Sequence, residues 1–211
     1  MGFVGDDGEF TGFDLEMAAE VAKRLNLTIA YQPIAWDAKD MELDAGTIDC
    51  IWNGFTMNGR EDDYEWSKPY MKNNQVFVVR GDSDINSEAD LAGKNVEVQT
   101  DSSAEAALND NSELTSTFGS LTPVADYNTA FMDLESGAVD AIAMDDVVTS
   151  RKADFKVLDD VIAAEEYGIG FKKGNTGLRD KVQATLEEMA ADGTAAKISE
   201  KWFGKDITTI Q

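Results

Sequence analysis

The chain of 211 residues contains no histidine and a single cysteine, Cys50. Without histidine it lacks the usual general base, the commonest metal ligand and the usual partner of a serine or cysteine nucleophile. One cysteine excludes an intrachain disulfide and a cysteine-based zinc site, and we expect neither a metal nor a cofactor. Cys50 lies in an apolar run, where a buried, unreactive thiol is expected. Catalysis is therefore disfavoured, although chemistry based on carboxylates alone stays open.

Positive charge is also scarce. Lys and Arg number 18 against 41 Asp and Glu, which gives a formal net charge of −23. So acidic a chain repels phosphate backbones and anionic lipid headgroups, so we expect no nucleic-acid partner and no direct membrane binding. The excess suits a solvated surface; attraction of a cationic ligand and a saline habitat are the alternatives.

Long apolar runs are absent as well, since none approaches the roughly 18 residues that span a bilayer. The start, Met1-Gly2-Phe3, lacks both the basic region and the apolar core of a signal peptide. From these residues alone, the protein is either cytoplasmic or trimmed.

One pattern occurs twice. Residues 43–49 and 134–140 both have the form Leu-x-x-Gly-x-x-Asp, and each is followed by a short apolar stretch that turns polar, at 50–54 and 141–145. Glycine suits the left-handed position after a helix, and the apolar stretch predicts a buried strand. Because ligands bind at the carboxyl ends of strands in open α/β sheets, two such ends facing each other would form a cleft.

The remaining patterns predict alternating strands and helices. Residues 3–12 predict a hairpin, Asp14 caps a helix, Ser87-x-x-Asp90 is a capping box, and 81–84 is a linker. The first helix has an apolar face formed by Leu15, Ala18, Val21, Ala22 and Leu25. Strands are expected at 28–34, 50–52, 75–79, 95–99, near Val124, and at 141–143, 157–158 and 167–171; further helices are expected through Met41 and Leu43, at 104–108, from Leu178, and through Ile198 and Trp202.

Alternating strands and helices indicate an α/β fold with mostly parallel sheets flanked by helices. Their order predicts two lobes. The first comprises 1–81 plus 168–211, and the second, 85–165, is inserted into it. Two crossover strands would join the lobes as a hinge.

A set of motifs then occurs in a recognisable order: Gly12-Phe13-Asp14-Leu15, Trp36-Asp37, Leu43-x-x-Gly46-x-x-Asp49, Gly54-Phe55-Thr56, Arg60, Trp66-Ser67-x-Pro69-Tyr70, Asp90-Leu91-x-Gly93-Lys94, Tyr167-Gly168-Ile169-Gly170-Phe171 and Lys201-Trp202-Phe203-Gly204. Together, across essentially the whole chain, they resemble the polar amino-acid-binding proteins of bacterial ABC importers, the type II solute-binding family. The resemblance implies a two-lobe periplasmic-binding-protein-like (type II) fold. It also implies capture of an L-amino acid in the interlobe cleft by hinge closure, and delivery to an ABC transporter permease.

The resemblance assigns ligand contacts in the first lobe. Arg60 would grip the ligand α-carboxylate, which a guanidinium fork can bind through two parallel hydrogen bonds. Thr56 would donate to the same carboxylate, and the carbonyl of Gly54 would accept from the ligand ammonium. Trp36 would pack against the ligand side chain, with Trp52 as a second wall.

In the second lobe, Ser103 would offer free N–H groups at a helix start. Gln99 would line the side-chain pocket, and Asp145 would face the ammonium with Met144 beside it. These side chains favour a polar or mixed pocket, and the acidic surface favours a basic ligand. Outside the resemblance, Arg60 could equally be in a surface ion pair, Asp145 in a solvated loop or cap, the tryptophans in the core, and Ser103 a helix cap.

Two departures from the family pattern affect these expectations. The family has a further strand before the segment seen here, ending in an acidic and an aromatic residue, so the site is either incomplete or completed by a partner chain. The segment between Thr56 and Arg60 is one residue shorter than usual, so the arginine needs a different loop.

The family implies a periplasmic or extracellular protein whose signal segment is absent from this chain. Any attachment to a membrane is expected only through a lipid anchor that lies outside this chain. An amino-acid-sensing module and a truncated or engineered binding protein are alternatives. A cyclohexadienyl dehydratase-like enzyme is a further one, which would need an acid such as Asp145 or Asp146.

Overall fold

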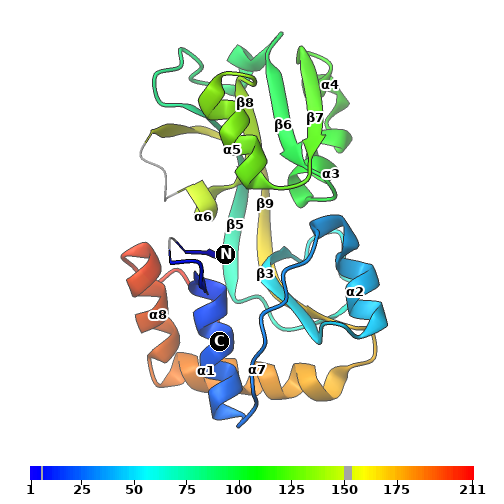
Figure 1. The fold of residues 1–211 in the computed structure, drawn as a ribbon, viewed down its shortest axis with the longest axis vertical. Coiled ribbons are helices and arrows are strands. Elements are labelled where there is room, and N and C mark those ends of the chain that lie inside the picture. Colours follow the sequence, from blue (N-terminus) through cyan, green and yellow to red (C-terminus); the bar gives the residue numbers. More distant parts are fainter. Residues whose placement is uncertain (6, 150–153) are drawn as a thin grey trace. The chain divides into compact units, whose positions relative to one another are not determined.

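The protein has an α/β fold, as the sequence predicts. The computed structural model describes residues 1–5, 7–149 and 154–211, with side chains of 148 and 149 left out, so Asp6 in the predicted hairpin turn lies outside the described residues. The chain forms two compact units: unit 1 comprises 1–34, 38–72 and 165–211, and unit 2 comprises 35–37 and 73–164 (Figure 1). From the sequence, the lobe boundaries were predicted at 81–85 and 165–168. In the structure, the boundaries between the two units lie within strands β5 (Met71–Arg80) and β9 (Phe155–Phe171).

Unit 2 is built around a sheet. Its strands lie in the order β5, β8 (Ala141–Asp145), β6 (Asn95–Gln99) and β7 (Ser120–Val124). Strand β6 runs parallel to both β7 and β8, while β5 and β8 are antiparallel. Helices α3 (Ser103–Asp110) and α5 (Tyr127–Ser136) pack on β6 and β8.

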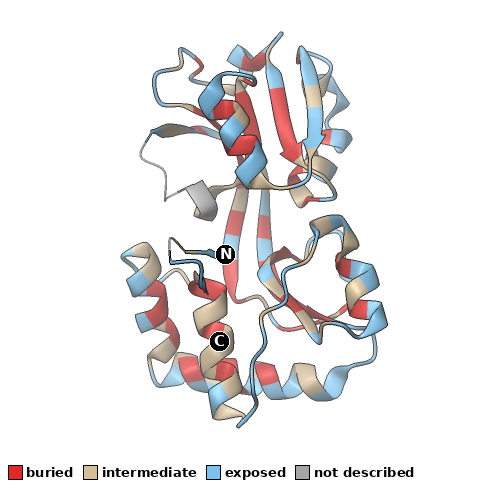
Figure 2. Cartoon of the chain, in the orientation of Figure 1, coloured by how far each residue is buried: buried red, intermediate tan, exposed pale blue. Residues whose placement is uncertain are grey.

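Alternation along these strands divides the core of unit 2 into two clusters, because successive side chains leave opposite faces of a sheet. Val96 and Val98 of β6 pack with Ala104 and Leu108 of α3. The other cluster contains residues 76, 78, 142 and 144 of the strands, together with α5 residues. In Figure 2 β6 is mostly buried, whereas β7 carries exposed positions.

The twice-occurring pattern forms the predicted helix–glycine–strand unit in both places. Helix α2 (Lys39–Ala45) ends at Gly46 with φ 75°, and β3 (Cys50–Thr56) follows. Helix α5 ends at Gly137 with φ 79°, and β8 follows. A left-handed φ favours glycine at these two positions.

Unit 1 combines short strands with longer helices. Strands β1 (Gly2–Val4) and β2 (Phe10–Gly12) form the predicted antiparallel hairpin. Strands β3 and β4 (Glu65–Trp66) both pair antiparallel with the last residues of β9. Around them lie α1 (Phe13–Arg24), η1 (Trp36–Ala38, of which Ala38 belongs to unit 1), α2, α7 (Thr176–Ala191) and α8 (Thr194–Phe203).

The short remaining elements belong to unit 2. They are η2 (Glu88–Leu91), α4 (Ser112–Thr115) and α6 (Asp146–Thr149). The predicted capping box at η2 is confirmed, since the side chains of Ser87 and Asp90 bond to each other's backbone N–H groups.

One strand prediction was wrong, and two predicted strands proved to be continuous. Residues 28–34 form no strand, because no neighbouring strand supplies hydrogen bonds there, and Leu27 and Ile29 are 54% and 36% exposed. The strands expected separately at 157–158 and 167–171 belong to one continuous strand, β9. Within the described residues, no helix is both long and apolar enough to cross a membrane.

Candidate ligand-binding site

The predicted carboxylate-binding group of unit 1 lies at the end of β3. The Nη1 atom of Arg60 donates to the carbonyl of Thr56 at 3.4 Å, and its guanidinium carbon lies 5.5 Å from the centre of the Phe55 ring. A tight turn, with the Arg60 N–H bonded to the Met57 carbonyl at 2.9 Å, directs the chain back toward the strand. The short segment after Thr56 therefore allows Arg60 and Thr56 to lie together.

Gly54 occupies an irregular point of the same strand. The pairing of β3 with β9 shifts register between Ile51 and Phe55, and Gly54 has φ 57°. A side chain there would be strained, and its Cβ would lie 3.4 Å from the Tyr167 ring. The bulge turns the Gly54 N–H toward the carboxylate of Asp14, at 2.7 Å.

Asp14 is a residue whose role the sequence prediction missed. Helix α1 is preceded by Gly12, and no side chain caps it, so Asp14 is not the expected cap. Instead Asp14 is fully buried and accepts hydrogen bonds from the Gly54 N–H and, at 3.0 Å, from the Tyr70 hydroxyl. The buried face of α1 is formed by Phe13, Asp14, Met17 and Val21, rotated from the predicted face.

The two predicted tryptophan walls are both half-buried. The Trp52 ring lies on β3 at 6.3 Å from the Tyr70 ring, and its buried Nε1 has no hydrogen-bond partner within the described residues. Trp36 lies on η1, in the short segment 35–37 that groups with unit 2.

In unit 2 the structure brings Asp145 and Ser103 to a shared partner. Asp145 is the last residue of β8, and its Oδ1 accepts from Gln75 Nε2 at 2.6 Å and from Asn73 Nδ2 at 2.8 Å. Gln75 Nε2 also donates to the hydroxyl of Ser103 at 3.0 Å. The sequence prediction missed both amides; three consecutive amides at the start of an apolar strand were the available signal.

Ser103 is the first residue of α3, as predicted, but the neighbouring residue caps the helix. The hydroxyl of Ser102 accepts the N–H of Glu105 at 3.1 Å. The Ser103 hydroxyl accepts from Gln75 Nε2 at 3.0 Å.

Gln99 and Met144 are not part of this group. Gln99 donates to the carbonyl of Ala125 at 3.2 Å at the end of β6. Met144 is fully buried in the cluster beneath α5, on the sheet face opposite the side chain of its neighbour Asp145.

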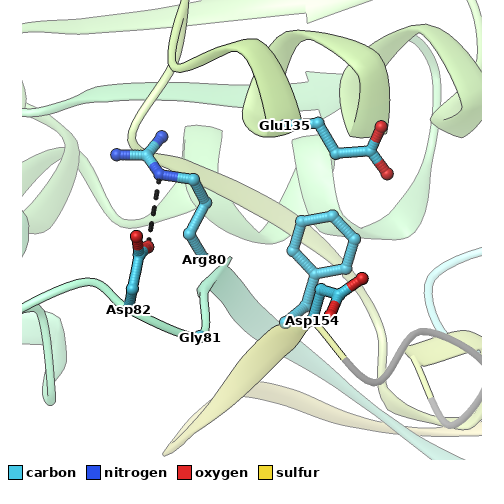
Figure 3. Close-up of a pocket in the computed structure, with 6 residues that line it drawn as sticks. Arg80, Gly81, Asp82, Glu135 and Asp154 are labelled. Carbon is cyan, nitrogen blue, oxygen red and sulfur yellow. Dashed lines mark ion pairs between the residues drawn. The ribbon is translucent and has the colours of Figure 1, made fainter.

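Two surface hollows lie elsewhere. One of about 560 Å³ in unit 2 is lined by residues 80–82, Glu135, Asp154 and Phe155; Figure 3 shows the guanidinium of Arg80 paired with Asp82, at 3.7 Å. Arg80 also donates to two backbone carbonyls, so this cation is already engaged. A second of about 600 Å³ in unit 1 is lined by Lys68, Pro69, Lys72, Glu166, Thr208, Thr209 and Gln211. Neither hollow is lined by a residue predicted to bind the ligand.

The lone thiol is poorly suited to chemistry. Burial, and secondarily the charge of Asp49, raise the pKa of Cys50 to about 12. At neutral pH the nucleophilic thiolate is therefore scarce. No cluster of three or more potential metal-binding side chains occurs in the parts of the chain that the structure describes.

Comparison with known proteins gives the family. The model of the bacterial extracellular solute-binding proteins, family 3, matches residues 1–205. The chain belongs to this family. The L-cystine-binding protein TcyJ of Escherichia coli K12 is 34% identical to this family 3 protein over 214 residues, which cover 98% of the chain and 79% of TcyJ.

Solved structures agree with the family 3 assignment. A substrate-binding protein of an ABC uptake transporter from Streptococcus pneumoniae, with bound histidine, is 33% identical; the match covers 99% of this chain and 89% of that one, with a TM-score of 0.93. An ancestral arginine-binding protein bound to arginine is 34% identical; the match covers 96% and 92% of the two chains, with a TM-score of 0.85. These relatives are binding proteins, and the family is extracellular by description, so a periplasmic or extracellular location follows.

Proposed function

We propose that this family 3 protein captures an L-amino acid and delivers it to an ABC transporter permease. The observation that carries the proposal is the family match over residues 1–205, joined to relatives that bind cystine, histidine and arginine. Hinge closure of the two lobes around the ligand is part of the proposal, as the sequence predicts.

The ligand α-carboxylate is assigned to the group at the end of β3. Arg60 supplies a guanidinium that binds a carboxylate through two parallel charge-assisted bonds. Thr56 lies beside it and contributes a donor. The half-buried Trp52 and Trp36 provide apolar surface for the ligand side chain.

The ligand ammonium is assigned to the carboxylate of Asp145 and to the carbonyl of Gly54, while the N–H groups at the helix start of Ser103 are assigned to an anionic group of the ligand. Charge-assisted hydrogen bonds contribute roughly 1.5–3 kcal/mol each. Four or five of them cover the ~8 kcal/mol of a micromolar complex after ordering costs. The proposal keeps Gln99 as a lining residue of the side-chain pocket and leaves out Met144, whose side chain is fully buried on the face of the sheet opposite that of Asp145.

Calorimetric titration with the twenty amino acids and L-cystine tests this function. We expect micromolar or tighter binding by at least one of them, together with a raised melting temperature, because a ligand that binds only the folded state stabilises it. Arg60→Ala should weaken that binding by at least about 100-fold, since two charge-assisted bonds are lost. Asp145→Ala should weaken it about tenfold or more.

Matched controls are available in both units. Arg179→Ala and Asp110→Ala remove the same charges from residues assigned no ligand contact, and should leave affinity within a factor of two. If Arg60→Ala and Asp145→Ala also stayed within a factor of two of wild type, the site assignment would be wrong. If no amino acid bound the unaltered protein, the function itself would be wrong.

We also propose that the protein has no catalytic role and that any membrane attachment is a lipid anchor outside this chain. The absence of histidine and the raised pKa of Cys50 support the first point. Incubation with prephenate or arogenate should yield no aromatic product; formation of one at enzymatic rates would contradict it.

A further inference from the structure

Three consecutive amide side chains open the unit 2 part of β5, and all three donate to acidic residues where β8 ends and α6 begins. Asn73 and Gln75 donate to Asp145, at 2.8 and 2.6 Å. Asn74, between them, donates instead to Asp146 at 2.9 Å. Odd and even positions of the strand thus hold different carboxylates, as expected from side chains that leave alternate faces.

The two odd-numbered amides are buried. Asn73 is 3% exposed and Gln75 is 1% exposed. Gln75 and Asp145 are also direct partners in the antiparallel ladder between β5 and β8. Burial and register together leave these amides little freedom to turn away from the carboxylate.

The amide of Gln75 has a second contact. Its Nε2 carries two hydrogens and lies within hydrogen-bond distance of both Asp145 Oδ1 and Ser103 Oγ. It thereby links the carboxylate at the end of β8 with the hydroxyl at the start of α3. These are the two unit 2 residues assigned to the ligand's polar groups.

We propose that Asn73 and Gln75 are positioning residues of the ligand site: they orient the Asp145 carboxylate, and Gln75 also sets its spacing from Ser103. This inference rests on the proposed function, in which Asp145 receives the ligand ammonium. Neither amide needs to touch the ligand for this role.

The choice of amides has an electrostatic consequence. An ionised carboxylate can only accept hydrogen bonds, so the NH₂ end of each amide must face it. Because amides are neutral, they orient Asp145 without cancelling its charge. A lysine or arginine in their place would form an ion pair and weaken the attraction for a cationic ligand group.

The hydrogen bonds themselves are tested without ligand. In ¹H–¹⁵N spectra of the ligand-free protein, Asp145→Ala should shift the side-chain NH₂ signals of Asn73 and Gln75. The NH₂ signal of Asn74, bonded to Asp146, should move much less and serves as the internal control. Unchanged signals for Asn73 and Gln75 would overturn the proposal, whatever the protein binds.

The positioning role is tested with a double-mutant cycle, using L-cystine, L-histidine and L-arginine as probes in calorimetry. Gln75→Met and Asn73→Leu keep similar volumes but remove the donors, and each should weaken binding about tenfold, as expected for a lost hydrogen bond to a charged group. In an Asp145→Asn background the same substitutions should change affinity by less than a factor of two, because they act through that carboxylate.

Asn74→Leu is the matched control and should stay within a factor of two of wild type. Equal losses with and without the Asp145 carboxylate would overturn the positioning role. If Gln75→Met does not fold, Asn73→Leu completes the cycle by itself. If the unaltered protein binds no amino acid, the proposed function fails, while the spectra still decide whether the two amides hold Asp145.

Discussion

Glu97 offers a sharp test of the energetics of unit 2. It lies in the middle of β6 and is 6% exposed, and its Oε2 is buried without a hydrogen-bond partner within the described residues. Burial raises the pKa of Glu97, and the nearby carboxylate of Asp133 raises it further. Ionisation of Glu97 is therefore less favourable in the folded state than in the unfolded chain.

Glu97→Gln should stabilise the protein at pH 7. The new amide has the same shape and can donate to Asp133, so it replaces repulsion by a hydrogen bond. A hydrogen bond to a charged group contributes about 1.5–3 kcal/mol, and one polar atom of the new amide still lacks a partner, so we expect a net gain of about 1–2 kcal/mol in the free energy of unfolding. For a chain of this length that corresponds to a rise in melting temperature of about 2–8 °C.

The pH dependence of this stability gain follows from the linkage between proton binding and folding. A carboxyl whose folded-state pKa is raised contributes most stability below the unfolded pKa of about 4.3, and loses that contribution as pH rises through the folded-state pKa. The advantage of Glu97→Gln should therefore be largest at pH 7–8 and vanish below about pH 4. Thermal unfolding monitored by circular dichroism from pH 3.5 to 8 measures it.

Glu113→Gln is the control, because it removes the same charge from an exposed position on α4. It should change the melting temperature by no more than a degree or two. A Glu97→Gln variant that melts lower than wild type at pH 7, or whose difference does not depend on pH, would refute the reasoning.

Three further outcomes are expected. Cys50, with its pKa raised to about 12 by burial, should react with a maleimide at pH 8 at least ~100-fold more slowly in the native protein than in urea. Asp14→Ala should destabilise the protein by about 3 kcal/mol in urea unfolding, because two buried donors lose their acceptor, and Asp14→Asn should cost less. Hydrogen bonds from Thr194 and Arg24 lower the pKa of Asp192 to about 2, so Asp192→Asn should reduce the melting temperature at pH 5–7, and the difference should fade as pH falls from about 4 toward 2. Equally fast maleimide labelling of Cys50 in the native and urea-unfolded protein would contradict the first inference. An Asp14→Ala variant with unchanged free energy of unfolding would contradict the second, and a melting-temperature difference for Asp192→Asn that does not change with pH would contradict the third.

Local patterns predicted the elements whose signals lie close together in the chain. The two Leu-x-x-Gly-x-x-Asp segments, the hairpin and the capping box at Ser87 all depend on glycine conformation or short-range hydrogen bonds, and all appear in the structure. The segment 28–34 has the composition of a strand, but a strand needs a neighbour, and composition does not report one.

The candidate site was only partly accessible from sequence. Motif order placed Arg60 beside Thr56 and Ser103 at a helix start, and the structure agrees on both positions. Asp14 was misjudged because it precedes an apolar run, where caps are common, while its partners Gly54 and Tyr70 lie 40 and 56 residues away. The contact of Gln75 with Asp145 could not be predicted for the same reason, because it depends on the register between β5 and β8.

The division of the chain into units bears on how the protein forms during synthesis. Unit 2 consists almost entirely of one continuous stretch, 73–164, so its sheet can be completed once that stretch has left the ribosome or the export channel. Unit 1 must wait for 165–211, because β3 finds its partner only when the last part of β9 emerges. Until then the apolar face of α1 lacks α7 and α8, and that interval is when a nascent chain would most need a chaperone.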